Sequence, residues 1–182
     1  MGNINYLERL YSYLNNQEDF YGKVREFASR IRHISNKDGH VWIIGNGGSS
    51  SLANHFATDL CLVKSFHVSA ISLASNASIL TAVGNDFDFQ QVFSAQIRKS
   101  ADSDDLLVAI SSSGNSPNIL EALRVARDMG LFSFGVLGFD GGKAKELVND
   151  YFLVHSATKD YGPTEDIHSI FLHATREELE SN

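Results

Sequence analysis

The stretch that decides the fold is Val41–Asn54, VWIIGNGGSSSLAN, in which a short apolar run breaks into a loop of glycine and serine. The run Val41–Ile44 is typical of a buried strand, and beyond the loop apolar side chains recur at helical spacing as far as Leu60. Glycines let the backbone bend sharply and approach a ligand, and amides at a helix N-terminus attract anions. The sequence therefore predicts a phosphate-binding loop at 45–51, with a serine-capped turn as the alternative.

A second loop of the same kind follows the apolar run Leu106–Ile110 and reads SSSGNSP over Ser111–Pro117. Pro117 stands where a helix should begin, a position that suits proline. A helical pattern then continues through Ala126. Two strand–loop–helix units of this type in one chain indicate that both loops bind a single phosphorylated ligand, with chance recurrence as the alternative.

Strands alternate with helices along the whole chain, and each expected strand is a nearly continuous apolar run. This pattern predicts an α/β fold with a five-stranded parallel sheet covered on both faces. Ligands bind such sheets beyond the carboxyl ends of the strands, where both serine loops fall. Two amphipathic helices precede the first strand, and they could pack on their own sheet or on a second copy of the chain. The expected strands are 41–44, 67–73, 106–111, 132–137 and 151–154.

Charge and composition narrow the function. The 182 residues include 22 acidic and 15 basic side chains, for a net charge of −7, which argues against a nucleic-acid partner. No apolar run approaches the ~20 residues needed to span a membrane, and no secretory signal is indicated. The single cysteine, Cys61, is expected in the core and fits a cytoplasmic protein. We expect one domain over 1–182, with 1–38 as an N-terminal helical extension.

Ionisable side chains occur in two groups that could carry chemistry. His55 and Asp59 are four residues apart and so share one face of the helix that begins at the first loop. Periodicity places Asp166 and His173 together on the last helix, with Glu165 displaced from them. Imidazole and carboxylate groups could bind zinc or act as a general acid and base. The second group consists of Glu165, Asp166, His168 and His173.

The chemistry that needs such a set is aldose–ketose isomerisation of a sugar phosphate. A base moves a proton between C1 and C2 through an enediol, while an acid or a metal stabilises the developing oxyanion. Imidazole accepts and donates protons near neutral pH, which suits this role. Asn85 and Asp86 supply further polar groups that could hold sugar hydroxyls, or could simply form a turn.

Four motifs in this order, GNGGSSSLANHFATDL, AVGNDF, ISSSGNSPNIL and GFDGGK, resemble the sugar isomerase (SIS) domain of bacterial phosphoheptose isomerases. The resemblance covers nearly the whole chain and implies a flavodoxin-like SIS domain that forms a homotetramer with sites between subunits. It also implies conversion of sedoheptulose 7-phosphate to D-glycero-D-manno-heptose 7-phosphate, which feeds the heptose of cell-surface polysaccharide.

The resemblance also assigns roles to residues. His173 and Asp59 match the catalytic residues. One zinc ion per subunit is implied, and the residues that match its ligands are His55, Asp59, Glu165 and His173. The substrate-binding residues carried over or inferred from the loops are Asn46, Gly47, Gly48, Ser49, Ser51, Asn85, Asp86, Ser111, Ser112, Ser113, Ser116 and Glu165.

Three departures from the family pattern bear on function. Asp59 stands where the family has glutamate, one methylene longer, and misplacement of a catalytic group by about 1 Å can cost ~100-fold in rate. Glu165 stands where the family has glutamine, and its charge would strengthen binding of a divalent cation. This match also favours Glu165 over Asp166 at the site. The segment Tyr161–Pro163 replaces polar residues and could alter substrate preference.

The alternative function is a non-catalytic module that binds a phosphosugar or another protein, as some relatives of the family do. The departure at Asp59 motivates this hypothesis. Retention of both His55 and His173 argues for catalysis, because a binding protein has no evident need of a base.

Overall fold

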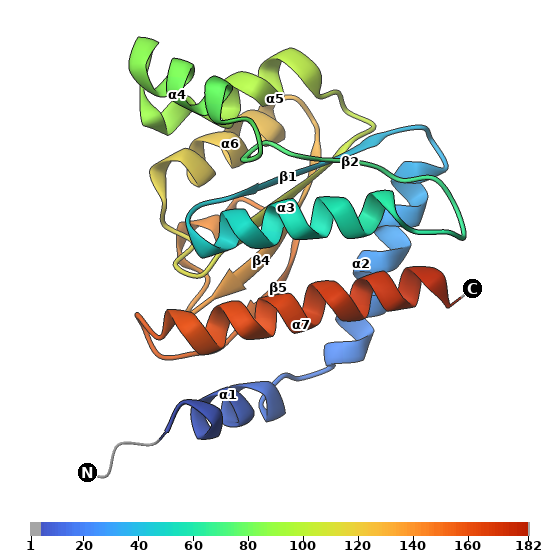
Figure 1. Ribbon diagram of the computed structural model, residues 1–182, viewed down its shortest axis with the longest axis vertical. Helices are drawn as coiled ribbons and strands as arrows, with labels where there is room; N and C mark the ends of the chain where they lie inside the picture. The colour runs from blue at the N-terminus through green and yellow to red at the C-terminus, as the bar shows by residue number, and fades with distance from the viewer. Residues whose placement is uncertain (1–4, 182) are drawn as a thin grey trace.

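Five parallel strands form the sheet that the apolar runs predict, in the order β2-β1-β3-β4-β5 (Figure 1). The structure is a computed structural model that describes residues 5–181, so the ends of the expected domain, 1–4 and 182, lie outside the described residues. The α/β fold class is confirmed. The strands are β1 His40–Gly45, β2 Ser69–Ser72, β3 Leu106–Ser111, β4 Phe132–Gly138 and β5 Asp150–Val154.

Helices cover both faces of this sheet, which is why its strands are apolar on both sides. On one face α2, α3 and α7 share a core in which the stacked rings of Phe27 and Phe134 lie 4.1 Å apart. On the other face α5 and α6 pack over Trp42 and Leu107. The helices are α1 Tyr6–Asn15, α2 Phe20–Ser35, α3 Gly48–Cys61, α4 Ala77–Asp86, α5 Ser94–Ser100, α6 Pro117–Asp128 and α7 Tyr161–Glu180, with short 3₁₀ helices η1 Phe89–Gln91 and η2 Gly142–Glu146.

The chain reverses its direction of winding between β1 and β3. From β1 it passes through α3 to the edge strand β2, and it then returns by α4 and α5 to place β3 on the other side of β1. Gly45, the last residue of β1, is aligned with Ile110, near the end of β3. The two serine loops therefore leave the sheet side by side at a switch point, where parallel sheets bind ligands.

The two N-terminal helices behave differently. Buried residues of α2, Phe27 and Ile31 among them, cover the protein's own sheet. Helix α1 instead lies along α7 (Figure 1), and the hydroxyl of Tyr6 donates a 2.5 Å hydrogen bond to Asp166. The outer side of α1 leaves Leu7 and Tyr11 about 70% exposed.

Local expectations from sequence needed correction in three places. Helix α3 begins at Gly48 rather than near 51, since Gly47 adopts a positive φ of 54° that turns the chain directly into the helix. The last helix is expected from about Pro163 to Glu180, but α7 begins at Tyr161, since proline is tolerated in a first turn where its missing N–H is not needed. The placement of Cys61 in the core was wrong, since this side chain is exposed at the end of α3. Among the described residues, none of the helices has the length and apolar character that crossing a membrane requires.

His168 of α7 points into the core and is fully buried. Neither of its ring nitrogens makes a hydrogen bond of good geometry to any described residue. Burial lowers the pKa of His168 to about 4, against a weaker opposing effect of the Leu137 backbone. The folded protein therefore holds this imidazole in its neutral form, and protonating it favours the unfolded chain.

We expect this burial to make stability fall as the pH drops from about 6.5, where the unfolded imidazole titrates, to about 4. The loss from this group is about 3 kcal/mol, complete below the lower value and absent above the upper one. Chemical denaturation at pH 7, 5.5 and 4 measures it, and His168→Leu should flatten the curve relative to wild type. His67→Leu, at an exposed position, is the control. Equal pH dependence in wild type and His168→Leu would contradict the assignment.

Candidate functional site

The two serine loops line a single pocket of about 140 Å³ at the carboxyl ends of β1 and β3. Gly47 and Gly48, at the start of α3, stand between the lining residues Asn46 and Ser49 in sequence but are not themselves part of the lining. Ser51 lies one turn further along that helix and is exposed. The lining residues are Asn46, Ser49, Ile110, Ser111, Ser112, Ser113, Ser116, Tyr161 and Glu165.

The pocket offers groups that favour an anion. The first turn of α3 has no side-chain cap, and although the Ser50 amide donates to the carbonyls of Asn46 and Gly47, the amides of Gly48 and Ser49 have no partner among the described residues, at the helix end whose dipole attracts negative charge. Ser111 and Ser113 accept hydrogen bonds from the backbone at 3.1 and 3.3 Å, which leaves their own hydroxyl hydrogens free to donate. The buried hydroxyl of Ser112 has no partner among the described residues. A phosphoryl group would satisfy these donors.

A reciprocal amide pair joins the two loops. Asn46 donates to Asn118 at 2.8 Å, and Asn118 donates back to Asn46 at 2.9 Å. Asn118 is 2% exposed and also accepts the backbone hydrogen of Ile119. Because Asn46 belongs to the first loop and Asn118 to the helix after the second, this pair sets the distance between them.

Glu165 and Asp166 face different ways. Glu165 lies against the start of α3, so close that a Cβ on Gly48 would stand 2.3 Å from its carboxylate. Asp166 points to α1, where it accepts from Tyr6. Burial raises the pKa of Glu165, and the neighbouring Asp166 carboxylate raises it further. A carboxyl that protonates more readily is better tolerated beside a bound phosphate.

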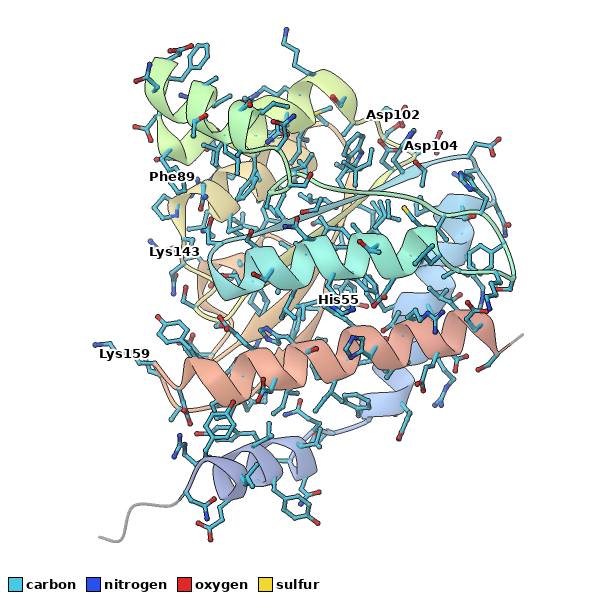
Figure 2. All side chains as sticks on the ribbon, in the orientation of Figure 1. His55, Phe89, Asp102, Asp104, Lys143 and Lys159 are labelled. Carbon is cyan, nitrogen blue, oxygen red and sulfur yellow. The ribbon has the colours of Figure 1, made fainter. Side chains whose placement is uncertain are left out.

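His55, Asp59 and His173 form a second cluster between α3 and α7. The Nε2 atoms of the two histidines are 3.5 Å apart, and the Asp59 carboxylate lies 3.4 Å from His55 and 3.9 Å from His173. Figure 2 shows the His55 side chain in the space between the two helices. Tetrahedral zinc bound at ~2.0–2.1 Å spaces its ligand atoms by about 3.4 Å, so three protein ligands could meet one ion here. The donor set fits zinc.

Other predicted residues lie elsewhere. Glu165 is not part of this cluster, since eight residues separate it from His173, or about 12 Å along a helix. Asn85 and Asp86 end α4, are exposed, and hydrogen-bond each other at 2.8 Å away from the pocket lining. His168 belongs to the core. The roles given to Glu165, Asn85 and Asp86 stay predictions.

Sequence reasoning passed over two residues of the pocket region. Asn118 stood inside the second motif but carried no assigned role, and a polar residue directly after the helix-starting proline was the available signal. Tyr161 was noticed only as a departure from the family, although its ring lines the pocket.

Comparison with known proteins gives consistent matches. The family model described as "SIS domain" matches residues 5–138. The chain is 40% identical over 152 residues to a phosphoheptose isomerase of Aliarcobacter butzleri, covering 81% of this chain and 79% of that one. The solved phosphoheptose isomerase of Neisseria gonorrhoeae superposes with a TM-score of 0.85 at 28% identity, over 95% of this chain and 94% of that one. That of Francisella tularensis has a TM-score of 0.80 at 25% identity, over 98% and 100%.

Asn118→Ala tests the amide pair. The change leaves the Asn46 amide and the Ile119 N–H without a partner, and we expect a loss of about 1–3 kcal/mol in unfolding free energy. Binding of inorganic phosphate should weaken as well, because the loops lose their fixed separation. Asn36→Ala, at an exposed helix end, should change neither quantity. Wild-type affinity in a destabilised Asn118→Ala variant would mean that the pair supports the fold and not the pocket.

Proposed function

This chain belongs to the SIS domain family, and we propose that it is a phosphoheptose isomerase that converts sedoheptulose 7-phosphate to D-glycero-D-manno-heptose 7-phosphate. Membership of the family, predicted from the four motifs, is confirmed by the family model and by a relative that is 40% identical over 81% of this chain. The enzyme class is then an aldose–ketose isomerase. The product would enter heptose assembly for lipopolysaccharide or capsule.

One observation carries this proposal: helix α3 presents an anion pocket at its start and a His/Asp cluster further along. Ser49 lines the pocket and His55 belongs to the cluster, six residues on, or about 9 Å along the helix. A sugar phosphate that reacts at C1 and C2 carries its phosphate at the opposite end. We infer that a ligand held by its phosphate in the serine pocket extends its carbonyl end toward the cluster.

Asp59 and His173 are the residues we propose for the proton transfers. The Asp59 carboxylate takes a proton from C1 of the ketose, and one ring N–H of His173 gives its proton to the C2 oxygen, with the other ring nitrogen left for a metal, which yields the enediol. Asp59 then returns its proton to C2, and His173 removes the hydroxyl proton at C1. The aldose forms, and both residues regain their starting states. Loop serines hold the phosphate throughout.

Zinc is the cofactor that we propose for the cluster, held by His55, Asp59 and His173. When bound, the ion would supply positive charge that stabilises oxygen anions formed at C1 or C2. Glu165 remains a candidate for the fourth zinc ligand only because it matches a zinc ligand of the family in sequence. Its position in the serine pocket favours a role beside the phosphate.

We further propose a homotetramer with sites at subunit interfaces. A tetramer built from pairs needs two self-complementary faces. The chain exposes one apolar cluster on α1, Leu7 and Tyr11, and another after α4, Phe87 and Phe89, which are 71% and 62% exposed. Asn85 and Asp86 adjoin the second cluster, so a partner's pocket is where they could meet substrate. A cytoplasmic location and the absence of a nucleic-acid partner stay predictions.

The activity test combines isomerisation and metal content. Purified protein loaded with zinc should convert sedoheptulose 7-phosphate to the aldose, and His173→Ala should lower kcat by at least ~100-fold and reduce bound zinc. His33→Ala, at an exposed histidine outside the cluster, should keep both. Absence of aldose from wild-type protein, with and without zinc, would reject the enzyme and favour the non-catalytic phosphosugar- or protein-binding alternative.

The assembly test uses the double variant Leu7→Ser, Tyr11→Ser. Removing two exposed apolar side chains from an interface weakens it, and we expect light scattering to show a species smaller than the wild-type tetramer. Leu62→Ser, also exposed but outside α1, is the control. A monomeric wild type would exclude the tetramer, and an intact tetramer in the double variant would exclude α1 as its contact.

A further inference from the structure

Tyr161 is the aromatic residue of the serine pocket. It is the first residue of α7, stands one turn before Glu165, and is about half exposed. Its ring meets that of Phe139 edge to face, with centroids 5.2 Å apart and planes at 70°. Such aromatic pairs prefer this geometry. Tyr161 lines the pocket together with serines of the second loop, and the buried Phe139 supports its ring.

The platform under Tyr161 is tightly packed. Phe139 has a positive φ of 57°, a conformation that a bulky residue keeps only where its surroundings impose it. The preceding residue, Gly138, has no space around its Cα. A Cβ there would lie 2.4 Å from the Thr164 side chain of α7 and 2.9 Å from the Ser112 carbonyl oxygen. The turn after β4 is therefore held between the serine loop and α7.

The start of α7 is fixed as well. Thr164 donates a 2.7 Å hydrogen bond to the Asp160 carbonyl and shares a 2.6 Å hydrogen bond with Ser156. A Cβ on Gly162 would stand 2.9 Å from the ring of Tyr6. Tyr161 is thus carried by backbone that has little room to shift.

The hydroxyl of Tyr161 makes no hydrogen bond to any described residue, and in the same pocket the hydroxyls of Ser111 and Ser113 only accept hydrogen bonds, which leaves their hydrogens free to donate. Because Tyr161 and the loop serines line the same pocket of about 140 Å³, a phosphoryl group bound by the serines would lie beside Tyr161.

We propose that Tyr161 is a substrate-binding residue whose hydroxyl donates a hydrogen bond to the phosphoryl group of the bound sugar phosphate, while its ring, supported by Phe139, closes that side of the pocket. This inference rests on the proposed function for the identity of the sugar. Tyr161, which departs from the family pattern, would then contribute to ligand selection at the phosphate end. It would take no part in the proton transfers near His173.

The test compares Tyr161→Phe, which removes only the hydroxyl, with Tyr161→Ala, which also removes the ring. Tyr21→Phe, at an exposed tyrosine of α2, is the matched control. Calorimetry gives the Kd of inorganic phosphate, and steady-state kinetics give KM and kcat for sedoheptulose 7-phosphate. We expect Tyr161→Phe to raise both Kd and KM about five-fold with kcat unchanged, and Tyr161→Ala to raise them further.

Wild-type Kd and KM in Tyr161→Phe, in a protein with the wild-type melting temperature, would overturn the assignment even if isomerase activity is present. A changed kcat at constant KM would also overturn it, because the contact would then belong to the reacting end. If wild type binds phosphate but isomerises no heptose phosphate, a raised Kd in Tyr161→Phe still supports the assignment while the proposed function fails. No phosphate binding and no activity in wild type would reject both.

Discussion

The pairing of Asn46 with Asn118 is the interaction on which the site depends. Parallel strands bring β1 and β3 level, but a loop of glycines and serines has many conformations of similar energy. Two hydrogen bonds of 2.8 and 2.9 Å between the side-chain amides restrict the conformations of the first loop and hold it at a fixed distance from the second. Since Asn118 is almost fully buried, breaking the pair would leave its polar side chain without a partner in the interior.

Much of the fold was predictable, because the arrangement of strands in the sheet follows from the local pattern of apolar residues along the chain. Apolar runs such as Leu106–Ile110 are too short for helices and too continuous for strands exposed on one face, so they indicate a covered parallel sheet. The spacing of helices between them excludes hairpins. Glycine and serine at the ends of two strands then locate the ligand, since topology alone brings those ends together. The pairing of His55 with Asp59 followed from helical spacing.

The remaining features arise from contacts between distant segments, which local pattern does not encode. His168 and His173 look alike in sequence, yet one lies in the core and the other faces α3, because the packing of α7 on the sheet sets its rotation. Glu165 and Asp166 are separated in the same way, by the approach of Gly48 on one side and Tyr6 on the other. Cys61, the last residue of α3, is exposed although its thiol donates a 3.4 Å hydrogen bond to the Ala70 carbonyl of β2, a contact between segments that the local pattern does not encode.

The shorter carboxylate at position 59 is compatible with this geometry. His55 and Asp59 lie on adjacent turns of α3, and their ligand atoms already stand 3.4 Å apart, the separation expected around tetrahedral zinc. The longer edge, 3.9 Å, joins Asp59 to His173 on the facing helix. To bind one ion, the Asp59 and His173 ligand atoms on α3 and α7 must therefore move closer together. Changes in the side-chain rotamers of the two half-exposed histidines can provide this movement. A missing methylene at Asp59 thus alters where an ion would sit between two helices and leaves the set of donors intact.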